Sequence, residues 1–140
     1  MTSPVSTTSF AAACALALAG CGGGGAPAAG PASAEAVARV AAYVSENRPR
    51  LPWRASSRQT IAGLRADGGE LVVALQLSRD MPADMAPDAI ARHNEALDRR
   101  TACRDPQLGE IIRLGGTIRH EVSTPNGTTF QTRVTGCPRG

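Results

Sequence analysis

Residues 59–78 read QTIAGLRADGGELVVALQLS and contain two apolar segments separated by Asp67-Gly68-Gly69. A turn of this composition is typical of a β-hairpin, so we predict that Gln59–Ala66 pairs with Glu70–Ser78. One face of the second segment carries Leu71, Val73, Leu75 and Leu77. Its other face also carries small apolar residues, which predicts a central strand that is covered on much of both sides.

A second hairpin is predicted near the C-terminus, where Thr117–Ser123 and Thr128–Thr135 flank Pro125-Asn126-Gly127. Apolar and polar side chains alternate along both segments. In the first segment, one face carries Ile118, His120 and Val122, and the other carries Arg119, Glu121 and Ser123. Alternation of this kind predicts an antiparallel sheet with one buried face and one solvated face.

A helix is predicted before the first hairpin. Ser33 is a suitable N-cap, and Pro49 should stop the helix near Asn47. The apolar stripe expected to face the core consists of Val37, Val40, Ala41 and Val44. Residues 48–54, RPRLPWR, are expected to form an extended connector.

Two further helices are predicted between the hairpins. Pro87 suits the first turn of one helix. The residues that share one face of this helix are Ile90, Asn94, Leu97 and Thr101. Asp105 and Pro106 begin the other helix, which should end at Gly115 or Gly116. The order α-ββ-αα-ββ predicts an α+β domain with a four-stranded, mainly antiparallel sheet and helices on one face.

The composition fits a single domain that does not bind nucleic acid. The chain has 140 residues, of which 42% are hydrophobic and 19% are charged, and this is the usual size of one domain. The net charge is +3, all 15 basic residues are Arg, and aromatic residues make up 3%. A nucleic-acid-binding surface combines basic stripes with stacking aromatic residues, so we expect no nucleic acid partner.

An apolar segment near the N-terminus has the features of an export signal. The segment FAAACALALA, Phe10–Ala19, has no charge. It is about half as long as a membrane-spanning helix and suits the core of a secretory signal. It ends in Leu18-Ala19-Gly20-Cys21, which resembles the lipobox of bacterial lipoproteins. The resemblance implies cleavage before Cys21 and acylation of that residue. The alternatives are an ordinary secretory signal with a chance Cys and a buried Ala-rich helix.

The residues after Cys21 are expected to form a flexible tether. Residues 22–33 contain only Gly, Ala, Pro and Ser, a composition that cannot bury a core. We therefore expect a signal peptide at 1–20, an acylated Cys with its tether at 21–33, and a single domain at 34–138. Because Gly22 replaces the Asp of lipoproteins retained at the inner membrane, the resemblance implies the cell envelope and the periplasmic face of the outer membrane.

The four cysteines differ in their expected roles. Cys14 lies within the predicted signal and Cys21 is the predicted lipid site, which leaves Cys103 and Cys137. Extracytoplasmic compartments are oxidising, so we predict one disulfide between these two residues. A metal-binding or redox pair is the alternative, although the sequence contains no Cys-x-x-Cys motif.

The sequence contains no pattern that indicates catalysis or metal binding. His93 and His120 lack the spacing and the intervening Glu of a zincin, and no Gly-x-Ser-x-Gly motif is present. Asp80, Asp84 and Asp88 recur every four residues, but prolines interrupt them, and we interpret this segment as a solvated connector. We therefore predict no enzymatic activity, no metal and no cofactor, with a structural role for His120.

Trp53, which lies near Arg50 and Arg54, is the candidate for contact with a partner protein. Trp and Arg are enriched at the energetic centres of interfaces. Met81 and Met85 would add an adaptable apolar surface. The alternative is that Trp53 covers one end of the core.

The domain also resembles a group of small exported proteins of Gram-negative bacteria. In the N-terminal half, the resemblance rests on Leu51-Pro52, Thr60 and Gly69. In the C-terminal half, it rests on Cys103, Leu108, Ile112, Gly115-Gly116, Ile118, Gly127, Phe130 and Cys137. Some members are similar to the pilotins of type II secretion, lipoproteins that bind a segment of a secretin and carry it to the outer membrane. The resemblance implies an α+β domain with one disulfide.

These observations favour a lipid-anchored envelope lipoprotein that acts through protein interaction or assembly. Its partner would be an unidentified envelope protein, bound without catalysis. The alternative is a surface inhibitory or exclusion lipoprotein that acts against a phage, a toxin or a hydrolase. An enzyme or a small-ligand binder would need a concave pocket with converging polar groups.

Overall fold

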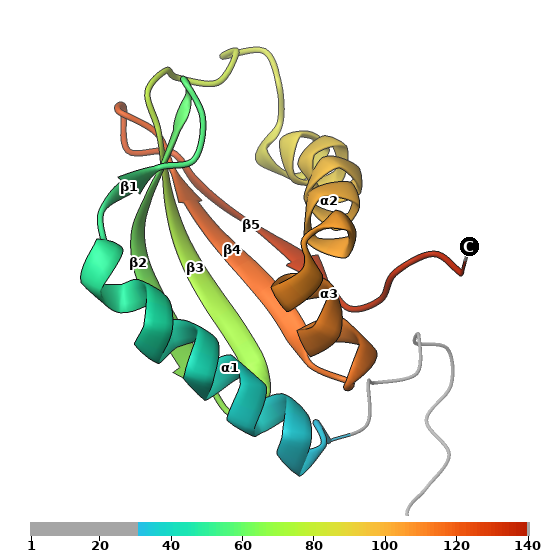
Figure 1. Ribbon diagram of the computed structural model, residues 1–140. Coiled ribbons are helices and arrows are strands. Elements are labelled where there is room, and N and C mark those ends of the chain that lie inside the picture. The colour runs from blue at the N-terminus through green and yellow to red at the C-terminus, as the bar shows by residue number, and fades with distance from the viewer. Residues whose placement is uncertain (1–30, 140) are drawn as a thin grey trace, which may run out of the picture.

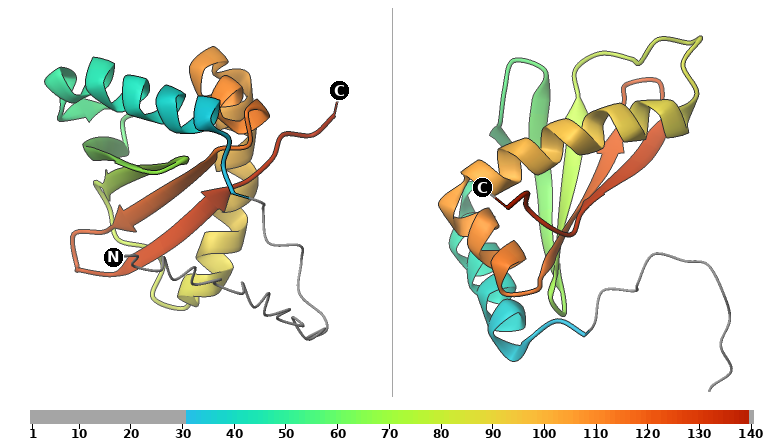
Figure 2. Two further views of the ribbon diagram at one scale, coloured as in Figure 1. Left: turned by 90° about the horizontal axis from the view of Figure 1, so that it is seen from below. Right: turned by 90° about the vertical axis from the view of Figure 1, so that its right-hand side faces the viewer.

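The structure is a computed structural model that describes residues 31–139. Within this range, a five-stranded sheet carries three α-helices on one face (Figures 1 and 2). The elements are α1 (Ala34–Asn47), the 3₁₀ turn η1 (Arg48–Arg50), β1 (Trp53–Arg54), β2 (Gln59–Asp67), β3 (Glu70–Leu77), α2 (Pro87–Arg104), α3 (Pro106–Arg113), β4 (Thr117–Ser123) and β5 (Thr129–Val134). The predicted signal peptide, the lipobox and most of the predicted tether lie outside the described residues.

The sheet is mixed and five-stranded, whereas we predicted four mainly antiparallel strands. Both predicted hairpins are confirmed, because β2 pairs with β3 and β4 pairs with β5 in antiparallel fashion. The strand order is β1-β2-β3-β4-β5, and β3 and β4 are parallel. They are parallel because α2 and α3 carry the chain back along the sheet before β4 begins. The additional strand, β1, lies within the predicted connector and pairs with Thr60 and Ile61 of β2.

Helix α1 begins as predicted but buries a different face. The hydroxyl oxygen of Ser33 accepts a hydrogen bond from the backbone N–H of Ala36 at 3.1 Å, which is the expected N-cap. The buried residues of α1 are Ala36, Val40, Val44 and Asn47. Val37 is 39% exposed. The buried face of α1 is therefore rotated relative to the predicted stripe. The helix packs on the sheet through residues spaced by three or four, and Val37 and Ala41 lie on its flank.

Both helices between the hairpins are confirmed. Asp105 caps α3, because its side chain accepts hydrogen bonds from two backbone N–H groups at 2.9 and 3.0 Å. In α2, Ile90 and Ala102 are buried, whereas Leu97, which the helical spacing places on one face with Ile90, is 49% exposed. Helix α2 lies over β5 with Asp98 directed at the sheet. No helix among residues 31–139 is both long and apolar enough to cross a membrane.

The core lies between the sheet and the helices. The largest fully buried side chains are Leu71, Ile90, Ile111, Ile118, Val40, Val72 and Val134. A disulfide between Cys103 and Cys137 joins the last turn of α2 to the segment after β5. The predicted disulfide is thus confirmed, and it links the helical layer to the sheet.

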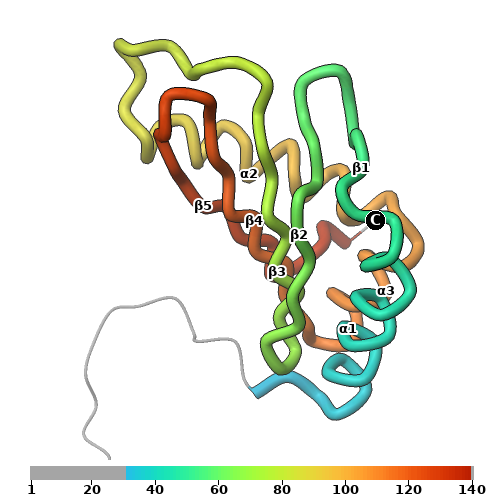
Figure 3. The backbone as a smooth tube through the Cα atoms, turned by 90° about the vertical axis from the view of Figure 1, so that its left-hand side faces the viewer, coloured from blue at the N-terminus to red at the C-terminus, as the bar shows by residue number. Residues whose placement is uncertain are grey.

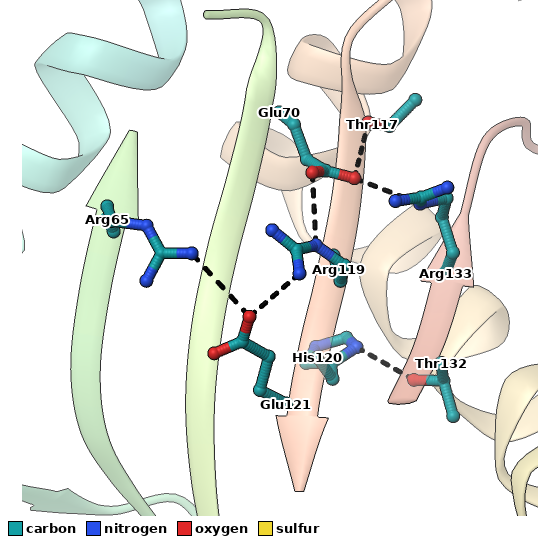
Figure 4. Close-up of polar contacts among 8 residues, drawn as sticks. All are labelled: Arg65, Glu70, Thr117, Arg119, His120, Glu121, Thr132 and Arg133. Carbon is teal, nitrogen blue, oxygen red and sulfur yellow. Dashed lines mark hydrogen bonds and ion pairs between the residues drawn. The ribbon is translucent and has the colours of Figure 1, made fainter. Parts of the chain in front are cut away.

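The opposite face of the sheet is covered by a network of charged side chains (Figure 4). Its members are Arg65, Glu70, Arg119, Glu121 and Arg133. Guanidinium nitrogens of Arg119 and Arg133 lie 3.0 and 2.9 Å from the carboxylate of Glu70. Val72, whose side chain points to this face, is 1% exposed. The prediction that β3 is central and covered on both sides is confirmed, with ion pairs covering the second face.

The two ends of the sheet hold different segments (Figures 1 and 3). At one end, Ala32 lies so close to Gly69 in the β2–β3 turn that a Cβ on Gly69 would overlap it. At the other end lie the β1–β2 loop, the segment 78–86 that leads to α2, and the β4–β5 turn. The candidate functional site is at this second end.

Candidate functional site

A groove opens where the β1–β2 loop, the segment after β3 and helix α2 meet. Its volume is about 530 Å³. The residues that line it are Ser56, Arg58, Gln59, Leu77, Arg79, Asp80, Met81, Pro82, Asn94 and Leu97. We call it the helix-side groove, because Leu77 belongs to the face of the sheet that the helices cover.

Apolar side chains from three separate segments line part of the helix-side groove. Leu77 ends β3, Met81 lies in the segment before α2, and both pack against the core. Leu97 projects from α2 and is 49% exposed. Apolar side chains that stay accessible within a concave surface are typical of a binding site.

The charge along the groove is predominantly positive. Arg58 and Arg79 line it, and neither makes an ion pair within residues 31–139. The carboxylate of Asp80 accepts a hydrogen bond at 2.8 Å from the backbone N–H of Asn126 in the β4–β5 turn. Since this contact already engages Asp80, the two guanidinium groups favour a partner with acidic side chains.

Trp53, Arg50 and Arg54 are not among the residues that line the groove. Trp53 pairs with Ile61, is half-buried and packs against the core. The guanidinium carbon of Arg50 lies 5.5 Å from the centre of its ring, a cation–π distance. Arg54 pairs with Thr60, so its side chain points to the other face. This placement fits the alternative in which Trp53 covers one end of the core, and its contact with a partner stays a prediction.

His120 belongs to a polar cluster beneath α2, and part of this cluster is drawn in Figure 4. The hydroxyl of Thr132 donates a hydrogen bond to the carboxylate of Asp98 on α2. Nδ1 of His120 lies 3.3 Å from the Thr132 hydroxyl oxygen and 3.5 Å from Asp98 Oδ2. Burial lowers the pKa of His120, and the negative charge of Asp98 partly opposes this effect.

The cluster joins α2 to the sheet, because Asp98 belongs to α2 and Thr132 to β5. Asp98 directly follows Leu97 in the chain. The contact of Asp98 with Thr132, together with the burial of Ile90 and Ala102, sets the rotation of α2 that leaves Leu97 lining the groove.

We predicted no functional role for Leu97, Arg58 or Arg79. Met81 and Met85 were proposed only as adaptable surface. One available signal was the segment RDMPADM, residues 79–85, in which two Met residues stand in a polar segment. His93, expected to be solvated, is exposed in α2.

No protein-family model and no curated protein matches the sequence. Three solved structures share its fold. A protein of Pseudomonas aeruginosa described as secreted has a TM-score of 0.58 at 12% identity, covering 71% of this chain and 88% of its own. The type II secretion pilotin AspS of Vibrio cholerae has a TM-score of 0.56 at 13% identity, covering 72% of this chain and 89% of its own.

The third structure is EpsS, a type 2 secretion pilotin of Vibrio vulnificus. It has a TM-score of 0.55 at 13% identity, and the match covers 76% of this chain and 91% of EpsS. At these identities the likeness concerns the fold. The sequence resemblance to small exported proteins and pilotins is therefore confirmed at the level of the fold.

Proposed function

We propose that the chain is a lipid-anchored envelope protein that binds a segment of a secretin-type partner and assists its assembly. The observation that carries this proposal is the helix-side groove, which combines accessible apolar side chains with two unpaired guanidinium groups. The fold shared with two pilotins supports the same role. The function is one of binding, without a catalytic step.

The groove is suited to an amphipathic helix. An apolar stripe at helical spacing would contact Leu77, Met81 and Leu97. Acidic side chains beside this stripe would reach Arg58 and Arg79. Because Leu97 is 49% exposed in the chain alone, burying it against a partner would add favourable apolar contact.

The anchor would set where binding takes place. Acylation of Cys21 would hold the chain at a membrane, since two or more acyl chains make such anchoring stable. The twelve residues 22–33 contain only Gly, Ala, Pro and Ser, and a flexible chain of this length spans roughly 19 Å. The domain could then bind a partner segment while its lipid chains select the membrane.

The test is a complementation experiment in the bacterium that encodes the chain. The gene is deleted and replaced by the natural sequence, by Leu97→Glu or by Ala96→Glu, and the secretin of the same cell is located by membrane fractionation. We expect the deletion to lower the amount of secretin multimer in the outer membrane. Leu97→Glu should fail to restore it, whereas Ala96→Glu, which introduces the same charge at an exposed neighbouring position outside the groove, should restore it.

A Cys21→Ala variant tests the anchor separately. It should still bind the secretin segment in co-purification but leave the multimer outside the outer membrane. Unchanged secretin assembly in the deletion strain would contradict the proposed function. Full restoration by Leu97→Glu would instead show that the partner binds elsewhere on the domain.

A further inference from the structure

We propose that the free edge of β2 is a second binding surface, which takes up an extended acidic segment of a partner as an additional strand. The surface consists of residues 63–67 of β2 and the flank of α1 beside them. It lies apart from the helix-side groove, and no residue lines both. Its use therefore does not depend on the function proposed for that groove.

Most of this edge has no neighbouring strand. β1 pairs only with Thr60 and Ile61 of β2. Beyond them, the register between β2 and β3 shifts between Ile61 and Gly63. From Gly63 to Asp67, no strand of the described chain lies on the outer side of β2.

The backbone of two residues points toward this free edge. The carbonyl of Gly69 accepts a hydrogen bond from Thr117 of β4 at 3.0 Å, and alternate residues of a strand direct their backbone groups to opposite sides. Leu71 and Val73 of β3 therefore face β4. Their β2 partners are Ala66 and Leu64, which consequently direct their N–H and C=O groups away from β3.

The edge has room for side chains on both faces of an added strand. On the helix side, a groove of about 370 Å³ is lined by Ala41, Val44, Ser45, Arg48, Pro49, Arg65 and Ala66. On the other side, a hollow of about 130 Å³ is lined by Gly63, Leu64, Arg65, Val72, Ala74 and Glu121. Because successive side chains of a strand point to opposite faces, a bound segment would place alternate side chains in these two spaces.

The charged side chains beside the free edge of β2 indicate which kind of segment binds there. Arg48 and Arg65 are the charged side chains of the 370 Å³ groove, and Arg48 makes no ion pair within residues 31–139. The Arg65 side chain is 59% exposed and reaches Glu121 only at 3.5 Å. An acidic strand complements this edge, with its acidic side chains in the 370 Å³ groove beside Arg48 and its small apolar side chains in the 130 Å³ hollow on the other face.

The test measures binding of a synthetic extended peptide to the complete mature chain in lipid nanodiscs. The probe is the blocked hexapeptide EVEVEV with a fluorescent label, and KVKVKV is its charge control. We expect fluorescence anisotropy to show binding of EVEVEV at least tenfold tighter than of KVKVKV. Hydrogen exchange followed by mass spectrometry should show slower exchange in the segment 62–67.

Two variants locate the site. Ala66→Pro removes an outward N–H while leaving the β2–β3 ladder intact, because proline is tolerated on the free side of an edge strand. It should weaken EVEVEV binding at least tenfold. Arg48→Glu should weaken it several-fold, whereas Arg92→Glu, the same charge change on an exposed part of α2, should leave it unchanged.

Other results would overturn the proposal. Equal binding of the two peptides, or unchanged binding by Ala66→Pro, would show that the edge strand does not select an acidic segment. Protection of 62–67 that rises with protein concentration without peptide would identify a second copy as the occupant. If neither the peptide nor a second copy bound, the charged residues on this edge would serve only to limit strand pairing. That result would also contradict the proposal. Leu97→Glu alters the helix-side groove and should not alter EVEVEV binding. This variant therefore distinguishes a failure of the function proposed for that groove from a failure of the proposal for the β2 edge.

Discussion

Two neighbouring residues of β3, Val72 and Val73, are both buried, but on opposite faces of the sheet and by different means. Val73 faces the helices and is 6% exposed, whereas its neighbour Val72 faces the ion-pair network and is 1% exposed. Val73 is surrounded by the apolar core, while the network that covers Val72 consists of long charged side chains. Equal burial therefore conceals a difference in rigidity, because a packed core resists rearrangement more than surface side chains do.

The largest expected effect comes from detaching the helical layer from the sheet. Replacing both Cys103 and Cys137 by Ser removes a link across 34 residues, and the loop-entropy model gives a loss of about 3.8 kcal/mol in the free energy of unfolding. Urea denaturation followed by circular dichroism measures this loss. The natural chain in reducing buffer is the control and should lose the same amount, whereas a loss below about 1 kcal/mol would contradict the prediction.

A matched pair of truncations compares the two faces directly. Val73→Ala should cost about 2.5 kcal/mol, because it leaves a cavity in the rigid core in addition to the lost apolar burial. Val72→Ala should cost only about 1.5 kcal/mol, since the side chains of Arg65 and Glu121 can close over the space. Urea denaturation of both variants gives the difference. Equal losses would show that the ion-pair network is as rigid as the core.

Glu70→Gln tests the network itself. The variant keeps the shape of the side chain but removes the charge that pairs with Arg119 and Arg133. We expect a loss of about 1.5 kcal/mol in low salt, because these are charge-assisted hydrogen bonds at a side chain that is 17% exposed. Glu95→Gln, at an exposed pair with Arg99, should lose less than about 0.5 kcal/mol. A difference that does not shrink in 1 M salt would argue against an electrostatic cause.

The smallest effect concerns the pH dependence of the helix-covered face. Because the pKa of His120 is lowered by burial, the unfolded chain takes up a proton at a higher pH than the folded chain does. The free energy of unfolding should therefore fall as the pH decreases below about 6.5, the ordinary pKa of His. Melting temperatures at pH 7.5, 6.5 and 5.5 measure this loss.

Two substitutions assign the pH dependence to one group. His120→Gln should show a smaller decrease in melting temperature than the natural chain over this range. His93→Gln, at an exposed position of α2, should follow the natural chain. If His120→Gln retained the full decrease, another group would be responsible.

Features set by neighbouring residues were predictable from the sequence. The Asp-Gly-Gly and Asn-Gly turns specified the two hairpins, and Ser33 and Asp105 specified the starts of two helices. The disulfide followed from the exclusion of two other cysteines. These signals are local or compositional, so they hold whatever the arrangement of the elements in space.

Features set by packing between distant segments were not predictable in this way. The parallel pairing of β3 with β4 depends on how α2 and α3 cross the sheet, and no turn residue records it. Val37 was assigned to the stripe that faces the core, and this was wrong because helical spacing leaves the exact rotation of a helix undetermined. The helix-side groove was missed for the same reason, since its apolar wall depends on the rotation of α2.

The contact between Ala32 and Gly69 has a consequence for the orientation of the domain. The chain enters at the β2–β3 turn, whereas the helix-side groove lies past Leu77 at the far end of β3. The eight residues of β3 separate the two ends by about 26 Å. In a chain anchored through Cys21, the point of attachment and the groove would face opposite ways. An incoming segment could then approach from the aqueous side without entering the lipid headgroups.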